Sequence, residues 1–159
     1  MIIGKRRKIG RKIDEIKVGE KLELTEKIED RDILLYLGLT DDANPLYIQH
    51  DYASQTNFKA PVVPSIMLIG KIHSAISKYF PGPGSYILNQ EITFHHPVYH
   101  YTTVYFLLEI IDINIETETI KVSVRGKNEE GEQVLSGHLL VKPPQKKKTT
   151  EHLSLDSFY

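Results

Sequence analysis

The stretch TDDANPLYIQHDYA, residues 40–53, gathers side chains that can accept or hold a proton between two apolar segments. Two adjacent carboxylates, Asp41 and Asp42, precede an Asn-Pro pair and Tyr47. A positioned carboxylate is a common general base, because it can take a proton from water as a bond forms. A phenol suits that task poorly, since its unperturbed pKa is about 10 against about 6.5 for imidazole, but it can hold a water. Asp-x-Asn-Pro is also a common turn sequence, so the stretch alone leaves both interpretations open.

A histidine in a second, more apolar stretch is another candidate. At about 100° per residue, His73 shares a helical face with Ile69 and Ile76. A lone histidine on such a face is usually a hydrogen-bonded core residue. The alternative is an imidazole that serves a pocket beside the helix.

Three further histidines, His95, His96 and His100, lie close together in the segment FHHPVYHY. Clustered histidines are a frequent feature of metal sites. Neighbouring side chains on a strand point to opposite faces, so this spacing does not favour a shared metal ion. We therefore predict no metal site.

The pattern of apolar residues predicts the elements that position these side chains. Residues 18–28 alternate like a strand, residues 30–40 have helical spacing behind an acidic start, and residues 62–80 form a long apolar helix that PGPG ends. Four β-rich segments follow, at residues 85–94, 102–114, 119–127 and 133–142. One helix with four long strands after it and one before it predicts an α+β domain in which a curved antiparallel sheet wraps a central helix, the hot-dog architecture.

Length and composition fit one soluble globular domain. The chain has 159 residues, of which 40% are apolar and 26% charged. We assign residues 1–17 to a basic N-terminal segment, 18–142 to the domain and 143–159 to a polar tail. The formal net charge of -1 gives no global field that favours nucleic acid or a membrane. The basic runs Lys5–Lys12 and Lys146–Lys148 are typical of solvated ends, or of an edge that attracts phosphate.

The chain contains no cysteine, which excludes a disulfide framework, a thiolate nucleophile and a cysteine metal site. This fits a reducing compartment. The N-terminal residues lack the apolar run of a signal peptide, and nowhere do about 18 apolar residues run together as a membrane span requires. We therefore expect a cytoplasmic protein.

Three segments, LTDDANPLYIQHDYA, PVVPSIMLIGKIHS and FPGPGSYILNQEITFHHPV, resemble the MaoC-like family of (R)-specific enoyl-CoA hydratases and 3-hydroxyacyl thioester dehydratases. These are hot-dog proteins whose signature is G-D-x-N-P-x-H, and the resemblance extends from Val18 to Val141. It implies addition of water to a trans-2-enoyl thioester of CoA or acyl-carrier protein, or the reverse reaction. It also implies a dimer and no cofactor.

The resemblance assigns roles to the signature stretch. In the family, the Asp and His of the signature flank the water that is added. Here the Asp falls on Asp42 and the Asn on Asn44, while Tyr47 stands in place of the His and Asp41 in place of the Gly. The resemblance therefore predicts Asp42 as the base, Tyr47 as a catalytic residue that orders water, and Asn44 as a substrate-binding residue.

The same resemblance adds three residues from the helix and the strand after it. The family motif V-H-G-M, whose Gly N–H polarises the thioester carbonyl, becomes V-P-S-I here, with Ser65 at the Gly. A backbone donor at a helix N-terminus can still serve, although the serine side chain narrows the space. His73 occupies the position of a pocket serine and is predicted to be catalytic. Gln90 matches a strand position that faces the helix and is predicted to line the substrate site.

Two functions follow from these patterns. The first is a hydratase or dehydratase that uses Asp42, Tyr47 and His73. The second, suggested by the loss of the signature histidine, is a non-catalytic or partner-dependent hot-dog subunit that binds an acyl thioester. A thioesterase is a third possibility, because other hot-dog enzymes hydrolyse the same substrates, but the Asp-x-Asn-Pro and PGPG…NQ landmarks favour the hydratase branch.

Overall fold

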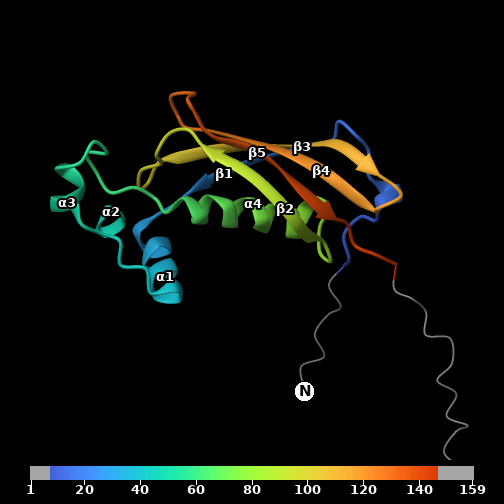
Figure 1. Cartoon of the computed structure of the whole chain (residues 1–159), viewed down its shortest axis with the longest axis horizontal. Helices are drawn as coiled ribbons and strands as arrows, with labels where there is room; N and C mark the ends of the chain where they lie inside the picture. The colour runs from blue at the N-terminus through green and yellow to red at the C-terminus, as the bar shows by residue number, and fades with distance from the viewer. Residues whose placement is uncertain (1–7, 147–159) are drawn as a thin grey trace, which may run out of the picture.

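The computed structural model describes residues 8–146 as a five-stranded antiparallel sheet that curves over one long helix (Figure 1). The strand order is β1-β3-β4-β5-β2. This confirms the predicted α+β hot-dog fold. The elements are a short 3-10 helix (Ile13–Glu15), β1 (Lys21–Lys27), α1 (Asp30–Thr40), α2 (Pro45–Ile48), α3 (His50–Ser54), α4 (Ser65–Tyr79), β2 (Tyr86–Phe94), β3 (Thr103–Asn114), β4 (Thr119–Lys127) and β5 (Gln133–Lys142).

The core lies between α4 and the concave face of the sheet. Leu68, Ile72 and Ile76 recur at helical spacing along α4 and are at most 3% exposed. They belong to one buried cluster with alternate residues of the inner strands, among them Leu108 and Val122. Burying apolar side chains of this size contributes about 1.5 to 3 kcal/mol each, so this interface fixes the position of α4.

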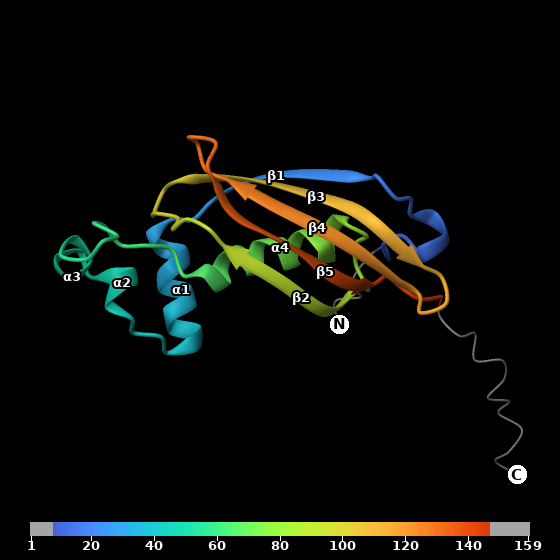
Figure 2. The same cartoon turned by 45° about the horizontal axis from the view of Figure 1, so that its top comes forward.

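Three short helices gather beside the N-terminal end of α4 (Figure 2). Helix α1 has the predicted bounds, because its apolar spacing and acidic first turn are clear in the sequence. Helices α2 and α3 have four and five residues and were not predicted, since so few residues show no helical period. Helix α4 begins at Ser65 and ends at Tyr79, within the predicted residues 62–80, because its N-cap Pro64 has a non-helical ψ of 125°.

Strand β2 is an edge strand that pairs only with β5. Its side chains Leu88 and Phe94 are 48% and 39% exposed. Gly137 of β5 lets the β2 backbone approach closely, because a Cβ at that position would lie 1.9 Å from the carbonyl oxygen of Glu91. One side of β2 is thus held tightly, while the other side has no strand beside it in the described chain.

The described parts of the two terminal segments pack at the end of the sheet that lies away from helices α1, α2 and α3 (Figure 1). The Gly10 N–H donates to the Pro83 carbonyl at 2.8 Å, Ile16 is buried in the core, and Pro143 is buried just beyond β5. The assignment of residues 1–17 and 143–159 as separate segments stays a prediction, and residues 1–7 and 147–159 lie outside the described part. Between residues 8 and 146, no helix has the length and apolar character needed to cross a membrane.

Candidate functional site

The turn after α1 sets the position of the signature carboxylate. Asp41 caps the helix in the left-handed conformation, with φ at 57°, and its N–H donates to the Leu37 carbonyl at 2.8 Å. Glycine adopts positive φ without steric cost, which explains why the resembled signature has Gly at this position. Asp41 tolerates the conformation less readily. The left-handed turn nevertheless reverses the chain, so that the side chain of Asp42 reaches Tyr36 on α1.

Asp42 is half-buried, and both of its carboxylate oxygens have partners. Oδ1 accepts the backbone N–H of Asn44 at 3.1 Å, and Oδ2 accepts the hydroxyl of Tyr36 at 3.1 Å. An ionised carboxylate has about four acceptor positions, so about two remain for water or substrate. The arrangement can hold a water molecule against a fixed base.

Asn44 has a structural role in placing Tyr47. Its Oδ1 accepts the N–H of Leu46 at 3.0 Å and so caps α2, in which Pro45 occupies the first turn. Its carbonyl oxygen accepts the N–H of Tyr47 at 3.0 Å. Substrate binding by Asn44 stays a prediction, because one of its side-chain acceptor positions is already used within the fold.

Tyr47 is half-buried and packs against the core cluster. It lines a hollow of about 180 Å³ together with His50 and His100, and Nδ1 of His100 lies 2.8 Å from Oδ1 of Asp30. The pKa of Tyr36 is raised, mainly by burial and then by its hydrogen bond to Asp42 and the charge of Asp42. Tyr47 makes a smaller contribution in the same direction. The Tyr36 hydroxyl therefore lies next to the Asp42 carboxylate, and Tyr47 is close enough to influence Tyr36. We call Asp42, Asn44 and Tyr47 the signature group.

Ser65 is the first residue of α4 and is exposed. The first N–H groups of a helix have no partner within the helix, and among residues 8–146 the Ser65 N–H makes no hydrogen bond, so it can serve as a donor at the helix N-terminus. Ser65 borders a hollow of about 280 Å³ that Phe58, Phe94 and His95 also line. The N–H of Val62, just before α4, donates to the carbonyl of Leu46 at 3.0 Å, which ties this end of the helix to the signature group.

His73 and Gln90 form a second group, which we call the helix–strand pair. Nε2 of His73 lies 2.7 Å from Oε1 of Gln90 and joins α4 to β2. Gln90 thus faces the helix as predicted. Within residues 8–146, no hydrogen bond joins His73 to Asp42 or Tyr47. Five of the six predicted residues thus fall into two groups, while Ser65 stands alone at the start of α4. The catalytic role of His73 stays a prediction.

The histidines of FHHPVYHY each have a different partner. His95 is bonded to Ser136 at 2.7 Å, His96 to the Gln133 carbonyl at 2.8 Å, and His100 to Asp30. In the part of the chain that the structure describes, no three acidic or histidine side chains gather as metal ligands. These histidines tie the loop between β2 and β3 to β5 and α1.

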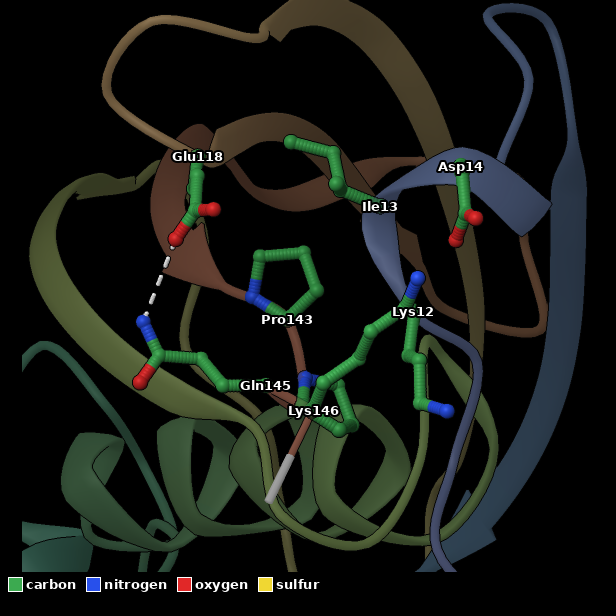
Figure 3. Close-up of a pocket in the computed structure, with 8 residues that line it drawn as sticks. Lys12, Ile13, Asp14, Glu118, Pro143, Gln145 and Lys146 are labelled. Carbon is green, nitrogen blue, oxygen red and sulfur yellow. Dashed lines mark hydrogen bonds between the residues drawn. The ribbon is translucent and has the colours of Figure 1, made fainter. Parts of the chain in front are cut away.

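Another hollow, of about 410 Å³, lies between the 3-10 helix and the segment that follows β5 (Figure 3). Lys12 and Lys146 line it beside Asp14 and Glu118, so its charges largely cancel. Gln145 donates to Glu118 at 3.3 Å across this hollow. None of the predicted site residues lines it, and we do not assign it to the site.

A five-stranded antiparallel sheet wrapped around one long helix is the arrangement of a hot-dog protein. The chain matches the MaoC like domain over residues 12–132, which is more than half of its 159 residues. It therefore belongs to the MaoC-like family.

Individual relatives agree with this assignment. An (R)-specific enoyl-CoA hydratase from Aeromonas caviae is 25% identical over 129 residues, which cover 81% of this chain and 96% of that protein. An (R)-specific enoyl-CoA hydratase from Rhodospirillum rubrum is 35% identical over 85 residues, so this chain matches 54% of its own length and only 59% of that protein. The unliganded R-hydratase PhaJ1 from Pseudomonas aeruginosa has a TM-score of 0.80 at 28% identity, covering 86% of this chain and 88% of that one.

Proposed function

We propose that the protein interconverts trans-2-enoyl thioesters and (R)-3-hydroxyacyl thioesters, with Asp42 as the base. The observation that carries this proposal is the Asp42 carboxylate, held through both oxygens at the signature position of a MaoC-like chain. Its relatives in Aeromonas caviae and Rhodospirillum rubrum are named (R)-specific enoyl-CoA hydratases, which supports the same reaction here.

In the hydration direction, the oxygen of water attacks Cβ of the enoyl group while Asp42 accepts one of its protons. The electrons of the double bond move toward the thioester carbonyl, where negative charge develops on oxygen. The Ser65 N–H at the start of α4 is the donor that we assign to this charge. A proton delivered to Cα completes the 3-hydroxyacyl product, and dehydration follows the same steps in reverse.

We assign to Tyr47 and His73 the two remaining tasks, which are to deliver the proton to Cα and to hold the attacking water in place. A phenol can donate a hydrogen bond to water, and an imidazole titrates close to neutral pH. The substrate class is a thioester of CoA or acyl-carrier protein. Support for both carriers comes from relatives named enoyl-CoA hydratase and 3-hydroxyacyl-[acyl-carrier-protein] dehydratase, the second from Solanum lycopersicum at 28% identity.

The same family resemblance implies a homodimer, or a heterodimer with a second hot-dog chain. The edge strand β2 supports this proposal, because within residues 8–146 it pairs on one side only, and an open edge with exposed Leu88 and Phe94 can pair with another strand. Sedimentation at micromolar concentration should give the mass of a dimer. A folded monomer under those conditions would contradict the assembly.

The second candidate is a non-catalytic or partner-dependent subunit that binds an acyl thioester. The observation that favours it is Tyr47, which replaces the signature imidazole with a group that is a weak base at neutral pH. In that case the purified chain alone would bind crotonyl-CoA without turning it over.

Loss of the enoyl-thioester absorbance of crotonyl-CoA tests the proposed reaction directly. The purified chain should hydrate the substrate, and Asp42→Asn should lower the rate by about 10²-fold or more, because the amide cannot accept the proton. Asp41→Asn is the matched control, since it changes the neighbouring carboxylate, and it should change the rate much less. An Asp42→Asn variant with nearly full activity would place the base elsewhere.

A further inference from the structure

Tyr36 on α1 reaches the signature carboxylate from outside the signature. Its hydroxyl donates to Oδ2 of Asp42 at 3.1 Å, while the Asn44 N–H binds Oδ1 at 3.1 Å. Among the described residues, it is the one side chain that donates a hydrogen bond to Asp42. A carboxylate held through one oxygen can turn about its Cβ–Cγ bond, but one held through both oxygens keeps its plane.

The hydroxyl of Tyr36 is well suited to remain a donor. Burial, the hydrogen bond to Asp42 and the charge of Asp42 all raise the pKa of this phenol, because its loss of a proton would put two negative charges together. Tyr36 is therefore protonated throughout the neutral range. It does not compete with Asp42 for the proton of water.

The geometry points to Tyr36 as a positioning residue that fixes the carboxylate plane of Asp42 so that its remaining acceptor positions face the reacting water. This inference rests on the proposed hydration, in which Asp42 is the base. Helix α1, through Tyr36, and the turn at Asp41 then orient the Asp42 carboxylate together. A chain that lacks the signature imidazole depends more strongly on such an orientation, because fewer groups are left to hold the water.

A purely structural role is the competing explanation. The carbonyl oxygen of Tyr36 also accepts the Thr40 hydroxyl at 2.8 Å, and Thr40 Oγ1 accepts the N–H of Asp42 at 3.3 Å. Tyr36 could thus do no more than tie the end of α1 to the turn. In that case its loss would lower the melting temperature and leave the rate per folded molecule unchanged.

Tyr36→Phe separates the two roles, with Tyr79→Phe as the matched control. Tyr79 lies on α4, is 60% exposed and makes no side-chain hydrogen bond within residues 8–146. We expect Tyr36→Phe to lower kcat for crotonyl-CoA by about ten-fold and to leave KM nearly unchanged. Tyr79→Phe should change none of these quantities.

The same measurement in an Asp42→Asn background completes the test. If Tyr36 acts through Asp42, Tyr36→Phe should cost little further rate in that background. An equal loss of rate in both backgrounds, or an unchanged kcat in the single variant, would overturn the inference. The proposed function would still stand if Asp42→Asn alone is slow. Full activity of Asp42→Asn, or no turnover by the unmodified chain, would instead overturn the proposed function and this inference with it.

Discussion

The signature group and the helix–strand pair are held in different ways. Asp42 is bonded to Tyr36, Thr40 and Asn44, which lie only two or six residues away along the chain. His73 instead meets Gln90, which lies 17 residues away on a different element. The first geometry depends on how one helix ends, and the second on how a helix packs against a sheet. A change of packing can therefore move His73 without moving Asp42.

The largest effect that would sharpen this contrast is expected from His73→Ala. If His73 supplies the imidazole that Tyr47 does not, removing it should lower the hydration rate by about 10²-fold, the scale of general acid–base catalysis. Initial rates with crotonyl-CoA measure the loss, and circular dichroism checks that α4 still packs.

The control for His73→Ala is His73→Gln, which keeps a polar side chain opposite Gln90 but cannot titrate. Both variants should lose the same rate if proton transfer is the role of His73. If His73→Gln is fully active while His73→Ala is slow, the residue serves packing and the contact between α4 and β2. If both variants are fully active, the helix–strand pair takes no part in the reaction.

Most of the fold could be predicted from the sequence, because its elements are long and strongly patterned. The four strands after α4 alternate or run apolar over nine to twelve residues, and their predicted bounds agree with the structure to within one residue. The bounds of α1 agree as well. The helices α2 and α3 escaped prediction because they have only four and five residues and so show no repeating apolar face.

The site was less predictable than the fold. The bond between His73 and Gln90 follows from a strand that faces the helix, and the family resemblance had already indicated that position. Tyr36 gave no such signal, because its contact with Asp42 requires the left-handed turn at Asp41 to bring the chain back toward α1. A residue placed by a backbone reversal cannot be found by helical spacing, since the period stops where the helix ends.

A smaller effect is expected from Tyr47→Phe, which keeps the ring packed against the core cluster and removes only the hydroxyl. The loss of one hydrogen bond to a water is worth about 1 to 1.5 kcal/mol, so the hydration rate should fall by about ten-fold. Stability should change little, because the packing of the ring is conserved. Initial rates and thermal unfolding of the same samples measure both quantities.

Tyr47→His tests the same position in the opposite direction. It restores the signature imidazole two residues after Pro45, in the helix that Asn44 caps. If the chain already uses His73 as its imidazole, a second one at residue 47 should bring little gain. The result could instead be that Tyr47→His is much faster than the unmodified chain while His73→Ala leaves the hydration rate unchanged. The signature imidazole would then have been lost and not replaced by His73. The signature group would then account for all remaining catalysis, and the chain would be a weakened or accessory hydratase whose full activity needs a partner with an intact histidine.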